Sequence, residues 1–133
     1  MKTIYKSLAT LLLSLAVASP LYAETSEVIC ATVEVTECVS GQACTETSSV
    51  AIDVPPFLRV NFEERMVTGK RANGDDLKAP ISFVHRTEAG VLLQGEDDGL
   101  GWSMTLSETD GSMSLAVSGD FVGYVIFGNC TPL

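Results

Sequence analysis

The chain has 133 residues, 46% of them hydrophobic, and its 17 acidic residues outnumber 8 basic ones, which gives a net charge of −9 at pH 7. The length suits one domain with one core. The charge argues against nucleic acid or an anionic membrane surface as partner, since both are polyanions that are bound by clustered Lys and Arg. It is compatible with a basic protein or a cation, and an acidic surface also keeps a secreted protein soluble.

The first 23 residues have the three regions of a secretory signal peptide. Lys2 and Lys6 supply the positive charge, the apolar run 8–18 follows, and the small residue Ala23 precedes the expected cleavage site. The run is too short to span a bilayer, so we expect no membrane insertion after signal removal. The expected product is a periplasmic or secreted protein with a single domain over residues 24–133.

Four cysteines in the mature part predict two disulfides in an oxidising compartment. A strand between Cys30 and Cys38 would hold them about 26 Å apart, far beyond the ~7 Å limit on Cα separation in a disulfide. Cys38 and Cys44 flank a short segment that can reverse at Gly41, which leaves Cys30 for Cys130. The expected bridges are therefore Cys38–Cys44 and Cys30–Cys130. A zinc site is the competing interpretation, but the spacing lacks a C-x2-C pair.

The first expected strand covers residues 28–36, where apolar residues alternate with polar ones. Its odd-numbered residues, from Ile29 to Val35, are expected to face the core, which places Cys30 on the outward face. Residues 38–49 are small and polar and predict a loop pinned by a disulfide. Further strands are expected at 50–53, 57–62, 66–70, 81–86, 91–94, 102–107, 112–118 and 121–127.

This succession of short strands predicts an all-β fold, a small antiparallel meander barrel of about seven or eight strands. A two-sheet β-sandwich is the alternative that strand number alone does not exclude. A barrel of about eight strands is either filled by side chains or holds one small ligand. Trp102, the single tryptophan, is the residue that we expect beside such a ligand cavity.

The last strand, residues 121–127, is apolar on both alternating faces. If Cys30 faces outward and bonds Cys130, the even-numbered residues of this strand should face outward as well. The expected outward strip, a candidate partner surface, consists of Val122, Tyr124 and Ile126. The odd-numbered residues Phe121, Val125 and Phe127 would then fill the core. The strip is expected either to lie under residues 38–61 or to contact a partner.

Residue types for catalysis are sparse. His85 is the single histidine, and no nucleophile with an orienting carboxylate is recognisable around it. The acidic turn 96–99 lacks the ligand spacing of a calcium loop. We therefore expect no enzymatic activity, no metal site and no cofactor, with an enzyme using His85 as a remote alternative.

The export signal, the C-x7-C-x5-C spacing of Cys30, Cys38 and Cys44, and the terminal Phe127-Gly128-Asn129-Cys130 resemble a type of small exported bacterial protein of uncharacterised activity. In architecture the chain is also similar to small periplasmic lysozyme inhibitors, which are disulfide-tied antiparallel barrels that bind a basic enzyme. No inhibitory motif matches residue by residue, so no site residue is carried over.

Three functions follow, in order of preference. The first is a non-enzymatic binding module that recognises a basic protein or another envelope component through its loops or its last strand. The second is a carrier with a small ligand inside the barrel beside Trp102. An enzyme is third.

Overall fold

The computed structural model describes residues 25–133, and the signal peptide expected at residues 1–23 lies outside this range. The described residues form strands but no helix, and so no helix that could cross a membrane. The strands are β1 (Glu27–Val39), β2 (Thr45–Thr47), β3 (Phe57–Asn61), β4 (Met66–Lys70), β5 (Asp76–Arg86), β6 (Gly90–Asp97), β7 (Leu100–Ser107), β8 (Ser112–Ser118) and β9 (Val122–Pro132).

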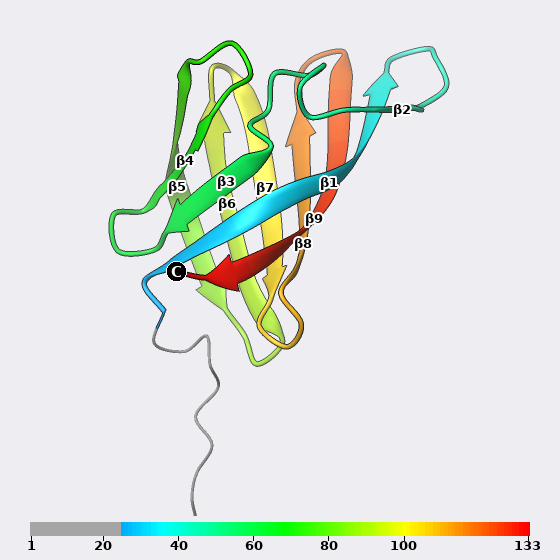
Figure 1. The fold of residues 1–133 in the computed structure, drawn as a ribbon. Helices are drawn as coiled ribbons and strands as arrows, with labels where there is room; N and C mark the ends of the chain where they lie inside the picture. Colours follow the sequence, from blue (N-terminus) through cyan, green and yellow to red (C-terminus); the bar gives the residue numbers. More distant parts are fainter. Residues whose placement is uncertain (1–24) are drawn as a thin grey trace, which may run out of the picture.

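Eight of these strands close a barrel (Figure 1). From β3 to β9 each strand pairs antiparallel with the next one in the chain, and β1 completes the ring by pairing with β3 and with β9. The short strand β2 pairs with the second half of β1 and extends the sheet there. The prediction of an all-β antiparallel meander barrel is confirmed, and the alternative of a two-sheet sandwich is wrong.

Both expected disulfides are present. Cys30 and Cys130 are paired residues of β1 and β9, with their Cα atoms 3.9 Å apart, so this bridge lies where the ring closes. Cys38 and Cys44 close the loop between β1 and β2, with their Cα atoms 4.2 Å apart. No cysteine among residues 25–133 is free. Two disulfides are consistent with an oxidising, extracytoplasmic location.

A β-bulge in β1 reverses the expected orientation of Cys30. The register against β9 shifts between Thr32 and Glu34, and Val33, at the shift, is 64% exposed. Before the bulge the even-numbered residues face the core, and after it the odd-numbered residue Val35 does. Cys30 is fully buried, so the expectation that it faces outward is wrong. The extra residue of a bulge interrupts the period of two on which that expectation depended.

The strip expected on the outside of β9 faces the interior instead. Ile126 is fully buried, and Val122 and Tyr124 are half-buried on the same side of the strand. The even-numbered residues do share the side of Cys130, as expected, but that side is the inner one. The residues expected in the core, Phe121, Val125 and Phe127, are exposed.

Two smaller differences concern the connection between β1 and β3. The expected strand at residues 50–53 is a series of turns, in which the amide of Ile52 donates to the carbonyl of Ser48 and Asp53 has a φ of 58°. A strand forms earlier, as β2, because Cys38–Cys44 holds residues 45–47 beside β1. This connection therefore leaves the sheet after β2 and returns to it at Phe57.

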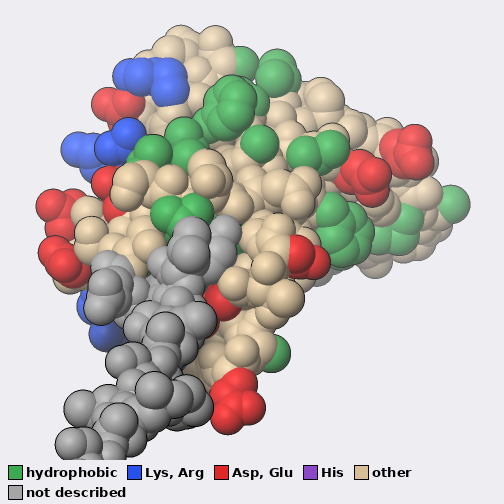
Figure 2. Space-filling view, turned by 60° about the horizontal axis from the view of Figure 1, so that its bottom comes forward, with side chains coloured by type: hydrophobic (Ala, Val, Ile, Leu, Met, Phe, Trp, Pro, Cys, Tyr) green, Lys and Arg blue, Asp and Glu red, His purple; other side chains and the backbone are tan. Residues whose placement is uncertain are grey.

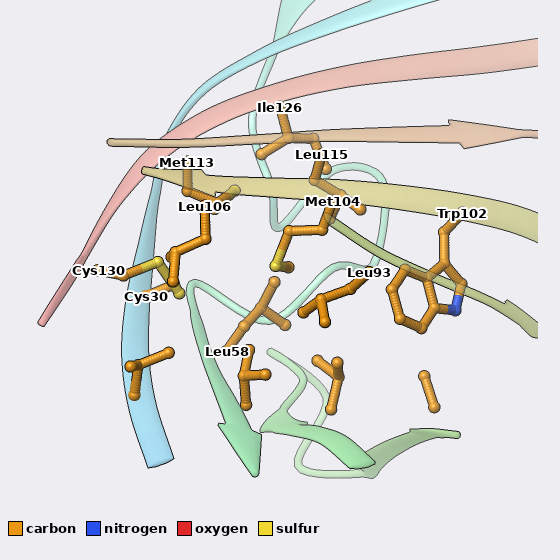
Figure 3. Close-up of a cluster of buried hydrophobic side chains, with 14 of the residues drawn as sticks. Cys30, Leu58, Leu93, Trp102, Met104, Leu106, Met113, Leu115, Ile126 and Cys130 are labelled. Carbon is orange, nitrogen blue, oxygen red and sulfur yellow. A yellow bond between two sulfur atoms is a disulfide. The ribbon is translucent and has the colours of Figure 1, made fainter. Parts of the chain in front are cut away.

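Apolar side chains fill the barrel from the disulfide as far as Trp102 (Figure 3). Along this row the figure shows Cys30–Cys130, then Leu106 and Met113, then Met104, Leu115 and Leu93, and finally Trp102. At the disulfide end a Cβ on Gly128 would lie 2.0 Å from the carbonyl oxygen of Ala31, so glycine allows β9 and β1 to approach closely there. The interior is packed at this end, and the space that remains lies at the other.

Candidate functional site

A cavity of about 270 Å³ lies at the end of the barrel where Trp102 is found. Its wall and floor are mainly apolar side chains that point inward from the strands, among them Leu58, Val67, Ala79, Met104 and Leu115. These residues follow from the period-two pattern of their strands, because every second side chain of a barrel strand faces the interior. The arrangement can hold a small apolar molecule.

Trp102, which the sequence placed beside a cavity, lines this one. Its side chain is 9% exposed, and its indole Nε1 has no hydrogen-bond partner among the described residues. Gly95 lies opposite it in β6 and leaves room for the ring. A buried N–H without an acceptor is uncommon, because losing water without a replacement costs about 1–3 kcal/mol. The indole N–H is therefore an enclosed donor without an acceptor among the described residues.

Residues 48–56 form a cap segment over the cavity, and Ile52, Val54 and Pro55 contribute to its lining. Turns with local hydrogen bonds shape the segment, such as the one that Val54 donates to the Ser49 carbonyl at 2.9 Å. Its end is fixed to β1 at the bulge, where the amide of Thr32 donates to the Pro56 carbonyl at 3.0 Å. The bulge that redirects Cys30 thus also anchors the cap segment.

Arg71 ties the cap segment to the rim of the barrel. Its guanidinium donates to the backbone carbonyl and the carboxylate of Asp53, with 3.2 Å to the carboxylate oxygen, and lies 3.5 Å from a carboxylate oxygen of Asp97 at the end of β6. The Arg71 side chain is only 22% exposed. These contacts connect three separate parts of the chain across the opening.

Tyr124 lines the cavity beside Glu37, its pairing partner in β1. Burial raises the pKa of the Tyr124 hydroxyl, and the charge and hydrogen bonding of Glu37 raise this pKa further. Tyr124 and Glu37 therefore place a phenol and a carboxylate next to each other at this end of the barrel.

Of the other residues considered from the sequence, Asp97 and Asp98 of the acidic turn line this cavity, whereas His85 does not join it. His85 is exposed on β5 and stacks on Phe83, with ring centroids 6.2 Å apart. In the acidic turn, the carboxylate of Glu96 accepts a hydrogen bond from the amide of Gly99 at 2.7 Å, which is a turn-stabilising role. Within residues 25–133 no group of His, Cys, Asp and Glu is arranged to hold a metal ion.

The outer face of the barrel carries an apolar surface that the sequence assigned to the wrong residues. Large exposed hydrophobic side chains lie on the neighbouring strands β3, β1 and β9 and just before β9: Val33, Phe57, Phe121, Val125 and Phe127. Figure 2 shows such side chains on one face of the molecule, with Asp and Glu beside them. We refer to these five residues as the outer apolar surface.

Three components of the site were not predicted from the sequence: the cap segment, Arg71 and Gly95. Glycine within an apolar strand does signal a close approach of other atoms, so Gly95 had a local signal. The cap segment and Arg71 act through contacts between distant segments and had none. Comparisons of the chain with known protein families, with curated proteins and with solved structures find no match.

Proposed function

We propose that the barrel binds one small, mainly apolar molecule in the cavity beneath the cap segment. The observation that carries this proposal is the cavity itself, about 270 Å³ of space lined mainly by apolar side chains. Protein interiors are close-packed and hold few voids larger than a water molecule. This space is open to solvent on one side and lies near the lower end of the range for small-molecule sites, which begins at about 300 Å³. Export to the periplasm or the medium, as the N-terminal sequence predicts, would make the protein an extracytoplasmic carrier.

The cap segment offers a route for the ligand. It is tied to the rest of the barrel by few polar contacts, chiefly those of Arg71 and Thr32. None of residues 48–53 is buried, whereas Pro55 is fully buried, and segments with few buried contacts open at a lower free-energy cost than the whole fold. Opening of the cap segment while the packed disulfide end stays closed would admit a ligand at one end only.

Fluorescence of the single tryptophan tests this function directly. Titration with 1-octanol should shift or quench the emission of Trp102, because the added molecule replaces the surroundings of the indole. Ala79→Leu fills part of the cavity and should weaken binding at least about tenfold, since the side chain that it adds overlaps the ligand. Ala116→Leu adds the same atoms on the exposed face of β8 and is the matched control.

Two outcomes would contradict the proposal. The first is an emission spectrum that no small apolar probe changes up to its solubility limit. The second is equal binding by the wild-type protein and Ala79→Leu, with both shown to be folded by their melting curves.

Recognition of a protein partner is a second candidate function, and the outer apolar surface favours it. Exposed apolar patches on soluble proteins often mark interaction sites. Glu34 on β1 pairs with Phe127 on β9. Thr36 on β1 lies between Glu46 on β2 and Val125 on β9, so a second carboxylate lies one strand away from Val125. A basic partner, of the kind that the resemblance drawn from the sequence to periplasmic lysozyme inhibitors implies, would suit these charges.

A pair of phenylalanine variants tests this second function. Phe127 and Phe83 are 48% and 45% exposed, and only Phe127 belongs to the outer apolar surface. A protein that the mature chain binds from envelope extract should be lost with Phe127→Ser and retained with Phe83→Ser. Equal loss or equal retention with both variants would rule out this surface.

A further inference from the structure

The rim of the cavity carries an excess of carboxylates. Four charged residues line it, the acids Asp53, Asp97 and Asp98 and the base Arg71. Arg71 is shared between Asp53 and Asp97, at 3.2 and 3.5 Å. Asp98 forms no ion pair with any residue in the range 25–133. By count, the lining has a net charge of −2.

Glu37 adds a further carboxylate near this end of the barrel, next to Tyr124. Lys70, at the end of β4, is engaged elsewhere, with its Nζ 2.6 Å from a carboxylate oxygen of Asp76. Within the described part of the chain, Arg71 is therefore the one cation that lines the cavity.

Charges at the mouth of an apolar cavity interact more strongly than charges in bulk water, because the effective dielectric constant is lower. An anionic head group would be repelled by Asp98 and would have to displace Asp53 or Asp97 from Arg71. A cationic head group would meet Asp98 without displacing any existing pair. The rim therefore discriminates between ligands that have the same apolar body.

On the basis of the proposed function, we infer that the ligand is a cationic amphiphile whose positive head group pairs with Asp98 at the rim. The apolar body lies in the cavity among Leu58, Met104 and Leu115. Trp102 forms part of the same lining. The ligand class is thus an amine with an apolar chain or ring.

Three probes with one apolar body test the charge preference. Octylammonium, 1-octanol and octanoate share an eight-carbon chain and differ in the charge of the head group at pH 7. Titration of Trp102 fluorescence, with calorimetry as a second readout, should give the tightest binding for octylammonium. We expect about fivefold tighter binding than for 1-octanol, the size typical of a partly exposed ion pair, and the weakest binding for octanoate.

Asp98→Asn locates the head group. Asp98 has a φ of 49°, a conformation that asparagine also adopts, so the turn should be retained. The variant should bring octylammonium to within about twofold of 1-octanol, since only the charge is removed. Glu88→Gln removes a charge from the exposed turn between β5 and β6, at the other end of the barrel, and should leave the preference unchanged.

The outcomes separate this inference from the proposed function. Binding of 1-octanol with octanoate as the tightest ligand would overturn the cationic class and leave the proposed function standing. A preference for octylammonium that survives Asp98→Asn would overturn the assignment to Asp98. Failure of all three probes to bind would remove the proposed function, and the inference with it.

Discussion

Gly95 and Trp102 face each other on β6 and β7, and the indole occupies the space that a side chain at position 95 would need. A Cβ on Gly95 would lie 2.4 Å from the ring carbon Cζ2 of Trp102 and 2.4 Å from the carbonyl oxygen of Pro80. Both distances are far below van der Waals contact. The absence of a side chain at position 95 therefore determines where the indole lies in the barrel wall.

Gly95→Ala should destabilise the protein by about 1–3 kcal/mol, the usual cost of adding atoms to a packed site, and should shift the emission of Trp102. Urea unfolding followed by fluorescence measures both effects. Gly101→Ala is the matched control in β7, because its Cβ would meet only Ser118 Oγ at 3.7 Å. Equal stability of the two variants would show that the ring does not need the space at position 95.

Arg71→Ala should loosen the cap segment without unfolding the barrel. The ion pairs to Asp53 and Asp97 are partly exposed, so their loss should cost no more than about 1 kcal/mol globally. Amide hydrogen exchange within residues 48–56 should become several-fold faster, and exchange in β7 should not change. Arg59→Ala, which removes the 3.4 Å ion pair to Glu27 elsewhere on the surface, is the control. Unchanged exchange of the cap segment in Arg71→Ala would mean that Arg71 does not hold it.

The two disulfides should contribute unequally to stability. They link residues 100 and 6 positions apart, for Cys30–Cys130 and Cys38–Cys44 respectively. In the chain-entropy description these loops correspond to about 4.7 and about 2 kcal/mol. Replacement of each pair by alanine, followed by denaturant unfolding without reductant, should show the larger loss for Cys30–Cys130, since this pair is also buried. A larger loss for Cys38–Cys44 would contradict the prediction.

Asp110 should make stability depend on pH in the acid range. Its carboxylate accepts hydrogen bonds from the backbone N–H of Ser112 at 2.9 Å and from the Ser112 hydroxyl at 2.8 Å. These bonds lower the pKa of Asp110 from 3.8 to about 2. A carboxyl with a lower pKa in the folded state stabilises the fold above the unfolded pKa, and this contribution is lost as pH falls from about 4 towards 2.

Urea unfolding between pH 5 and pH 2 measures this dependence. Asp110→Asn keeps an oxygen acceptor but cannot ionise, so its stability should fall less steeply over the same interval. Glu88→Gln, an exposed carboxylate in a neighbouring turn, is the control. Parallel curves for the wild-type protein and Asp110→Asn would exclude a contribution from this residue.

Most of the fold could be predicted from the sequence because a meander is built from local hairpins. In β7 and β8 apolar residues alternate with polar ones, and a turn ending in Gly111 separates the strands, so each element was recognisable by itself. The pairing of Cys30 with Cys130 then followed from the reach of the chain, although these residues are far apart in sequence.

The orientation of β1 and β9 could not be predicted, for two physical reasons. The bulge at Val33 changes which residues face inward halfway along β1, and the alternation of residues continues through it without a visible break. In β9 both faces are apolar, because one fills the core and the other forms part of the outer apolar surface. The expected orientation of β9 therefore depended on the expected orientation of Cys30. Because Cys30 was expected to face outward, Ile126 was expected to face outward as well, and both are buried. Arg71 was missed since its partners, Asp53 and Asp97, meet it only in the folded chain.

The closure of β1 on β9 makes the strand order of the barrel circular. Val28 pairs with Pro132, and the amide of Leu133 donates to the Glu27 carbonyl at 3.1 Å, so the two ends of the described chain are neighbours. A circular permutant that joins these ends by a short linker and starts at Gly74 would keep every strand pairing. In such a permutant the Cys30–Cys130 bridge and the new peptide connection would both hold β1 against β9.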